Sequence, residues 1–222
     1  MLGITTDSAL AVLTGMILLA ELNDLFPYAG NRAERFYEPL CEAMGEFEID
    51  SALRVSAFLA QIGVESGELK YVNELWGPTG WQARYERDPE AAWPPTKEDT
   101  KNRKAWDLGN SEDGDGRRFS GWGLIQTTGR KNTLRASQAL YGDERLCEVP
   151  TLIHPPDELL AARSAGLYWS DNRLNELADK DTPEAFRMLT KRINGASTDN
   201  EPSHHLRRVA YWLRGKDILG VT

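Results

Sequence analysis

Two glutamates, Glu65 and Glu74, are the residues in this sequence best suited to acid–base chemistry. Glu65 follows the apolar run 57–64, and a carboxyl group on such a surface loses solvation, which favours the protonated form that a general acid needs. Glu74 lies in the more polar segment 71–76, which suits an ionised general base. Taken singly, each glutamate is also compatible with a solvated surface position. Glu86 is the nearest competitor for the role of base.

The spacing of the two glutamates constrains how they could cooperate. On one continuous helix, nine residues would place them about 13.5 Å apart on opposite faces. An inverting glycosidase needs its two carboxyl groups roughly 6.5–9.5 Å apart. Gly67 can end the helix in a left-handed conformation and redirect the chain. The pair is therefore useful only if the helix ends near Gly67.

A second motif, GWGLIQTTGRKN, covers residues 121–132. Its first two glycines permit close approach of a ligand to the backbone. Gln126 and Thr128 share a face if the segment is extended, and Thr128 shares a face with Asn132 if a helix starts between them. These neutral side chains could hold sugar hydroxyls or a water. The alternative makes Thr128 a helix N-cap and Asn132 a surface residue.

Asn194 and a group of aromatic residues are further candidates for binding. Asn194 lies in KRINGAST, where Asn-Gly after an apolar helix is typical of a helix end and turn. Tyr71 and Trp76 belong to an aromatic group in or beside the polar middle of the chain. They could stack on sugar rings or form a satellite core.

The apolar spacing predicts a mainly α-helical fold with at most a small β-hairpin. Capping residues and helical periodicity predict helices over about 9–22, 31–44, 51–64, 128–140, 155–169, 182–193 and 202–214. Pro39 predicts a kink or a break in the second of these. The polar stretch 85–119 lacks a periodic stripe and is expected to be a loop region or arm. One catalytic domain over residues 1–222 is expected, without a separate cell-wall-binding domain.

Composition excludes several classes of protein. The chain has 222 residues, 41% of them hydrophobic, a net charge of −8 and a pI near 5.0. This acidity argues against nucleic-acid binding through bulk charge. Two cysteines and three histidines make a closed zinc site improbable, and no metal or cofactor is expected. The apolar segment 9–22 is too short to span a membrane and lacks a basic leader, so synthesis without an export signal is expected.

Three blocks together resemble a known enzyme family: FLAQIGVESGELKYVNELW, GWGLIQTTGRKN and KRINGAS. Their order and spacing resemble glycoside hydrolase family 19, which includes plant-type chitinases and many bacteriophage endolysins. The resemblance extends from about residue 31 to the last helix. It implies a lysozyme-like, largely helical, two-lobed fold with a substrate cleft. The compact length looks most like a phage endolysin or lysozyme of this family.

The resemblance also implies roles for individual residues. Glu65 would be the general acid, Glu74 the general base, and Thr128 would position the attacking water. Gln126, Asn132 and Asn194 would line the cleft. The sequence departs from the family pattern at Val64, where a His is usual, at Trp122, where an Arg is usual, and at Ala196, where a second Gly is usual.

The function expected from these residues is inverting hydrolysis of the β-1,4-linked glycan of bacterial peptidoglycan. The protein would be a monomer that is made in the host cytoplasm and reaches the cell wall after a holin-type pore has permeabilised the membrane. A chitinase and a lytic transglycosylase are the enzymatic alternatives. A non-catalytic, glycan-binding phage component is the alternative from another class.

Overall fold

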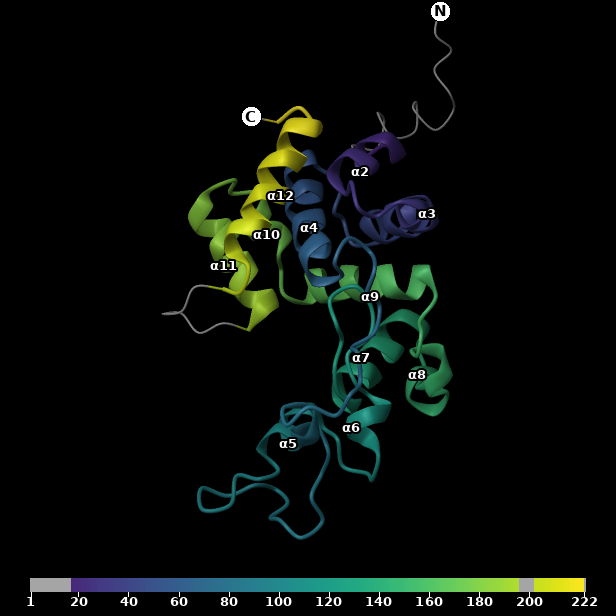
Figure 1. The fold of residues 1–222 in the computed structure, drawn as a ribbon, viewed down its shortest axis with the longest axis vertical. Coiled ribbons are helices and arrows are strands. Elements are labelled where there is room, and N and C mark those ends of the chain that lie inside the picture. Colours follow the sequence, from purple (N-terminus) through teal and green to yellow (C-terminus); the bar gives the residue numbers. More distant parts are fainter. Residues whose placement is uncertain (1–16, 196–201, 222) are drawn as a thin grey trace, which may run out of the picture. The chain divides into compact units, whose positions relative to one another are not determined.

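The computed structural model describes residues 17–195 and 202–221, which are mainly helical as predicted (Figure 1). The longer helices are α2 (Leu19–Leu25), α3 (Asn31–Glu46), α4 (Ala52–Glu65), α7 (Arg130–Tyr141), α9 (Glu158–Asp171), α11 (Pro183–Asn194) and α12 (His205–Ile218). The shorter ones are η1 (Gln82–Tyr85), α5 (Arg103–Leu108), α6 (Asp115–Arg118), α8 (Arg145–Glu148), η2 (Pro150–Leu152) and α10 (Asn175–Ala178). In place of a hairpin, the described residues form two isolated bridges, in which Trp122 pairs with Asn73 and with Thr127.

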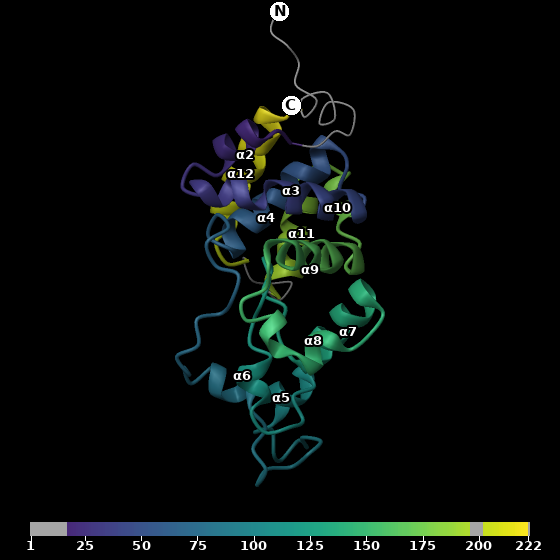
Figure 2. The same cartoon turned by 90° about the vertical axis from the view of Figure 1, so that its right-hand side faces the viewer.

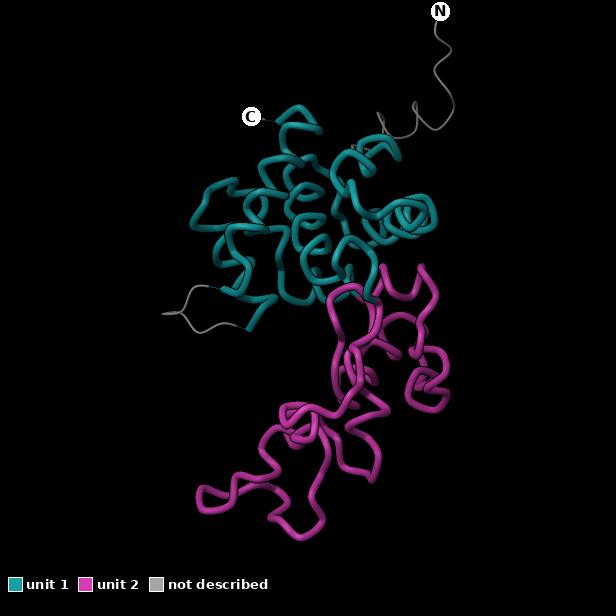
Figure 3. Tube along the Cα trace, viewed as in Figure 1, with its two compact units in different colours: residues 1–71, 165–222 teal, residues 72–164 magenta. Residues whose placement is uncertain are grey.

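The chain divides into two compact units, which Figure 3 shows in different colours. Unit 1 comprises residues 1–71 and 165–222, and unit 2 comprises residues 72–164. The division falls within α9 and after Tyr71. Glu65 therefore belongs to unit 1 and Glu74 to unit 2. That one catalytic domain spans residues 1–222 stays a prediction.

Helix α4 is the centre of unit 1. Ser51 caps it as predicted, because the side chain accepts a hydrogen bond from the amide of Arg54. Every residue from Val55 to Gly63 is buried, so the helix is covered on all sides. Helix α12 packs against α4 and lies beside it in both views (Figure 1, Figure 2). The two helices together position the end of α4, where Glu65 lies.

The structure bears on two predictions about the first helices, the break at Pro39 and the helix over 9–22. Helix α3 runs through Pro39 without a break. Proline removes one backbone hydrogen bond, but the buried face of α3, which includes Phe36 and Leu40, packs on both sides of it. The first part of the helix predicted over 9–22, residues 9–16, lies outside the described residues. Helix α2 begins at Leu19. None of the described helices has the length and apolar character needed to span a bilayer.

The polar stretch 85–119 in unit 2 contains the short helices α5 and α6. Asn102 is buried and organises it, because its side chain accepts from the amide of Asp88 and donates to the carbonyl groups of Asp88, Ala91 and Ala92. Trp93 packs edge-on against Trp106 at 4.8 Å between ring centroids. Side-chain-to-backbone hydrogen bonds order this segment, in place of an apolar stripe.

Candidate active site

The chain reverses direction directly after Glu65. Helix α4 ends at Glu65, and Gly67, Glu68 and Leu69 follow in the left-handed region with φ of 58°, 56° and 64°. Ser66 stabilises this turn, because its hydroxyl donates to the Ile62 carbonyl at 2.6 Å and accepts from the Leu69 amide at 2.8 Å. The predicted end of the helix at Gly67 is confirmed, so Glu65 and Glu74 do not share one continuous helix.

The carboxylate of Glu65 forms an ion pair with Arg208 of α12, at 2.6 Å between Oε1 and Nη2. Arg208 is buried, and its Nη1 donates to Gln61 Oε1 at 2.6 Å. Gln61 in turn donates to the Thr190 hydroxyl at 3.0 Å, and Arg208 Nε donates to the Ser203 carbonyl. Side chains from α4, α11 and α12 thus fix one oxygen of Glu65. Within the described residues, this network bonds to Glu65 through Oε1 and not through Oε2.

The expected surroundings of Glu65 were therefore wrong in one respect. Residues 57–63 are buried in the core of unit 1, but Glu65 faces a guanidinium group and its side chain is 20% exposed. The charge of Glu65 also affects Tyr168. Burial, and then the nearby Glu65 carboxylate, raise the pKa of the Tyr168 phenol. Arg208 lies on the buried face of α12, four residues before Trp212. That position of a charged residue was the signal in the sequence that could have revealed it.

In unit 2, Glu74 exchanges two hydrogen bonds with Gly121. The Glu74 amide donates to the Gly121 carbonyl at 2.7 Å, and the Gly121 amide donates to Glu74 Oε2 at 3.0 Å. Gln82 donates to Glu74 Oε1 at 3.0 Å, and the Tyr85 hydroxyl lies 3.5 Å from the same oxygen. Burial, and then the charge of Glu74, raise the pKa of Tyr85. Neutral donors therefore hold the carboxylate of Glu74 in place.

Gln126 and Thr128 pack against the same glycine. A Cβ atom on Gly121 would lie 2.5 Å from Gln126 Oε1 and 3.2 Å from Thr128 Oγ1, so a larger residue there would require the Gln126 side chain to shift. Thr128 donates its hydroxyl proton to the Gln126 carbonyl at 2.9 Å. Gln126 has a φ of 59°, and its Nε2 donates to the Gly123 carbonyl at 3.2 Å. The structure thus brings Glu74, Gln126 and Thr128 together around Gly121.

Asn132, Asn194 and Tyr71 are the other residues that the sequence predicted to bind substrate. Asn132 is exposed on α7, and its side chain donates to the Thr128 carbonyl at 2.7 Å. Gly129, not Thr128, is the N-cap of α7. Asn194 ends α11 before a left-handed Gly195, as predicted, and accepts from the Ser203 amide at 3.1 Å. Tyr71 is exposed and lies against Gly67 in unit 1.

Trp76 and Glu74 line one pocket of unit 2, with a volume of about 460 Å³. The other lining residues are Gly114, Arg117, Arg118, Ser120 and His154. The Trp76 ring lies 6.4 Å from that of Tyr85. A half-buried indole beside a carboxylate matches the predicted platform for a sugar ring, and this role stays a prediction. Among the described residues, no three His, Cys, Asp or Glu side chains gather closely enough to hold a metal ion.

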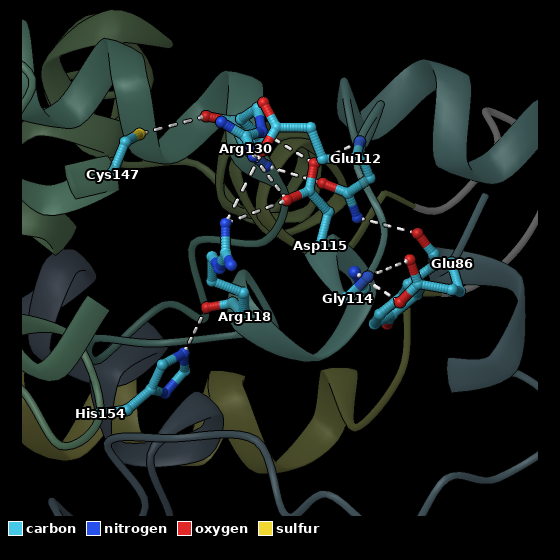
Figure 4. Close-up of polar contacts among 11 residues, drawn as sticks. Glu86, Glu112, Gly114, Asp115, Arg118, Arg130, Cys147 and His154 are labelled. Atoms are coloured by element: carbon cyan, nitrogen blue, oxygen red, sulfur yellow. Dashed lines mark hydrogen bonds and ion pairs between the residues drawn. The ribbon is translucent and has the colours of Figure 1, made fainter. Parts of the chain in front are cut away.

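Glu86, the competing candidate for the base, has a structural task. Its two oxygens accept hydrogen bonds from the amides of Gly114 and Gly116, at 2.9 Å and 3.0 Å (Figure 4). These contacts join the end of η1 to the start of α6. Glu86 does not line the pocket that contains Glu74.

A curated relative is similar to most of this chain. It is a glycosyl hydrolase family 19 domain-containing protein from Haemophilus influenzae, 30% identical over an alignment of 197 residues that covers 82% of this chain and 90% of the relative. The chain belongs to glycoside hydrolase family 19. It is therefore a glycoside hydrolase, and the recognition made from the three sequence blocks is confirmed. No model of a protein family matches the chain.

Solved family 19 structures share the fold. Chitinase C from Streptomyces griseus is 20% identical, with a TM-score of 0.64 and 93% of each chain covered. A bacterial family 19 chitinase is 21% identical, with the same TM-score and coverage of 93% of this chain and 96% of its own. The class IV family 19 chitinase from Zea mays is 18% identical, with a TM-score of 0.60, covering 93% and 94%.

The departures from the family 19 pattern have different consequences. Trp122 is fully buried, and its indole donates to the Thr133 hydroxyl at 3.1 Å, so it packs in the core of unit 2. An arginine there would be a buried charge, whereas tryptophan supplies apolar area and a single donor. Val64 is half-buried one residue before Glu65. Ala196 lies outside the described residues.

Proposed function

We propose that this family 19 enzyme hydrolyses the β-1,4 bonds of peptidoglycan glycan strands with inversion, using Glu65 as general acid and Glu74 as general base. The observation that carries the proposal is the convergence of Glu74 and Thr128 on Gly121. It supports a site that holds a water beside a carboxylate, which hydrolysis with inversion requires.

The hydrogen bond of Thr128 determines what this hydroxyl can do. Because its hydrogen is donated to the Gln126 carbonyl, Thr128 Oγ1 can accept a hydrogen bond from a water. Glu74, when ionised, can accept the other proton of that water. A water bonded in this way directs a lone pair at the anomeric carbon. As that carbon–oxygen bond forms, Glu74 takes the proton and the water becomes the new sugar hydroxyl.

On the acid side, Arg208 orients Glu65 through Oε1. The other oxygen, Oε2, would carry the proton. Glu65 delivers this proton to the glycosidic oxygen while the bond to the anomeric carbon breaks, so the leaving sugar departs as a neutral alcohol. The mechanism requires Glu65 and Glu74 to act on one glycosidic bond from opposite faces of the sugar. After each turnover, Glu65 regains a proton and Glu74 loses one.

Chitin is the second candidate substrate, because the solved relatives named above are chitinases. Purified peptidoglycan and chitin, digested in parallel and followed by mass analysis of the fragments, separate the two. Release of soluble muropeptides with ordinary reducing ends supports the proposal. Release of chitooligosaccharides, with peptidoglycan left intact, would make the protein a chitinase.

We also propose a biological role in phage lysis, with the enzyme reaching the cell wall through a membrane lesion and acting as a monomer. The resemblance to compact endolysins supports this role. Expression inside bacteria with and without a co-expressed pore-forming protein tests it by culture turbidity. Rapid clearing only with the pore is expected, and equal clearing without the pore would overturn the need for one. Sedimentation velocity tests whether the protein is a monomer, and a larger species would contradict that proposal.

A further inference from the structure

The pocket beside Glu74 carries more positive charge than hydrolysis of a neutral glycan needs. Its lining includes two arginines, Arg117 and Arg118, and one carboxylate, Glu74. Glu74 is held by the Gly121 amide and by Gln82, and it makes no ion pair with either arginine. The volume of about 460 Å³ falls within the range of about 300–1,000 Å³ that is typical of small-molecule sites.

The neighbouring acidic residues are already neutralised. Arg130 pairs with buried Asp115 through two hydrogen bonds of 2.7 Å, and with Glu112 at 2.6 Å (Figure 4). Arg118 lies farther from the same two carboxylates, at 3.8 Å and 3.9 Å, beyond hydrogen-bond distance. The negative charges of Glu112 and Asp115 are therefore matched by the positive charges of Arg118 and Arg130. Arg117 is not needed to neutralise them.

Arg117 has no such partner. It is exposed at the end of α6, and its guanidinium makes no hydrogen bond or ion pair with any residue in the described part of the chain. Both ring nitrogens of His154 already have partners, since Nε2 lies 2.8 Å from the Arg118 carbonyl (Figure 4) and Nδ1 lies 2.8 Å from the side-chain amide of Asn73. Among the described residues that line the pocket, Arg117 is the arginine without a partner.

We propose that this pocket is a subsite for a carboxylate carried by the glycan, with Arg117 as its ligand. A guanidinium group binds a carboxylate through two parallel hydrogen bonds, which gives it direction as well as charge. Trp76 supplies an apolar face for the sugar that carries the substituent. The inference rests on the proposed function. It makes Arg117 the residue that distinguishes an acidic amino-sugar glycan from neutral chitin.

Two parts of peptidoglycan could supply the carboxylate. Where the stem peptide is absent, the carboxylate belongs to the lactyl group of muramic acid. Where the peptide is present, the carboxylate belongs to the isoglutamate residue of the stem. Three β-1,4-linked tetrasaccharides of equal length distinguish these sources. One contains only N-acetylglucosamine, one contains muramic acid with free lactyl groups, and one carries an L-alanyl-D-isoglutamate dipeptide.

The experiment measures kcat and KM on each tetrasaccharide for the wild type, Arg117→Gln and Arg117→Lys. Arg103→Gln is the matched control, because Arg103 is an exposed arginine of unit 2 outside the pocket. We expect Arg117→Gln to raise KM about tenfold on one or both acidic substrates, with kcat and the neutral substrate unchanged. The more affected substrate identifies the source of the carboxylate. Arg117→Lys should restore part of the loss, and added salt should reduce the difference.

An equal change on all three substrates, or no change on any, would overturn the subsite and leave the hydrolase intact. If the wild type cleaved none of them, the proposed function would fail instead. The subsite is then decided by calorimetric titration of the same three compounds into the wild type and Arg117→Gln. Weaker binding of only the acidic compounds to Arg117→Gln supports it, and equal binding overturns it.

Discussion

Glu74 and Gly121 are joined by two hydrogen bonds, one between their backbones and one from the Gly121 amide to the Glu74 carboxylate. Gly121 also forms the surface on which Gln126 and Thr128 rest. A residue without a side chain is thus the point at which two separate motifs of the sequence meet. The position of the proposed base depends on how closely other groups approach this glycine.

Gly121→Ala should lower both activity and stability. The added methyl group would lie 2.5 Å from Gln126 Oε1, so Gln126 or Thr128 must move. Overpacking of this kind costs about 1–3 kcal/mol in free energy of unfolding. Gly80→Ala is the control, because a Cβ there meets nothing within 4 Å. The melting temperature and kcat should both fall for Gly121→Ala. Equal melting temperatures and equal kcat values of the two variants would contradict the proposed packing.

The two candidate bases predict opposite rankings of two variants. Glu74→Gln keeps the size of the side chain and one acceptor oxygen but removes the proton acceptor, so kcat should fall by about 10²–10⁴-fold. Glu86→Gln leaves the pocket untouched and weakens the contacts to Gly114 and Gly116, so it should mainly lower the melting temperature. Initial rates on peptidoglycan, with melting temperatures, measure both. A larger loss of rate for Glu86→Gln would move the base to Glu86.

The helix ends were predictable because their signals are local. Ser51 and Thr182 cap α4 and α11 through side chains that accept from amides three residues on. Gly67 and Gly195 adopt the left-handed conformation after those helices, as glycine favours. The separation of Glu65 and Glu74 onto different segments follows from such signals within a few residues.

Other features were not predictable, because they depend on contacts between distant parts of the chain. The helical spacing indicates that Arg208 is buried, but it does not indicate that Arg208 pairs with Glu65, which lies 143 positions earlier in the sequence. The short helices of 85–119 are ordered by polar contacts such as those of Asn102, which leave no periodic stripe. Trp122 is buried against Thr133, although a motif of glycines around it is also typical of an exposed loop.

Arg208 is a positioning residue, and its replacement should reduce kcat more than KM. Arg208→Met removes the donor from Glu65 and from Gln61, and a shift of about 1 Å in a catalytic group can cost about 10²-fold. Arg208→Lys keeps the charge without the planar fork and should recover part of the rate. Steady-state kinetics on folded protein, verified by circular dichroism, measure this. An unchanged kcat in Arg208→Met would remove Arg208 from the mechanism.

Tyr85 reports the charge of Glu74. Burial raises the pKa of Tyr85 first, and the Glu74 carboxylate raises it further. Because the folded pKa lies above the ordinary value of about 10, the stability linked to this group is full below about pH 10 and is lost as pH rises through the folded pKa. Glu74→Gln should lower the pKa of Tyr85 partway toward its ordinary value, and Glu86→Gln should not. Titration by ¹³C NMR of the tyrosine rings measures both, and an unshifted Tyr85 in Glu74→Gln would contradict the contact.

The configuration of the first products tests the central claim most directly, which is that Glu65 and Glu74 hydrolyse the glycan with inversion. Water held by Glu74 and Thr128 attacks opposite the leaving group, so a β-linked glycan must yield α reducing ends at first. Proton NMR within the first minutes of digestion distinguishes the anomers, and mass analysis detects the loss of one water in 1,6-anhydro ends. We predict ordinary reducing ends, initially α. Initial β products would contradict inversion, and mainly anhydro ends would show a lytic transglycosylase.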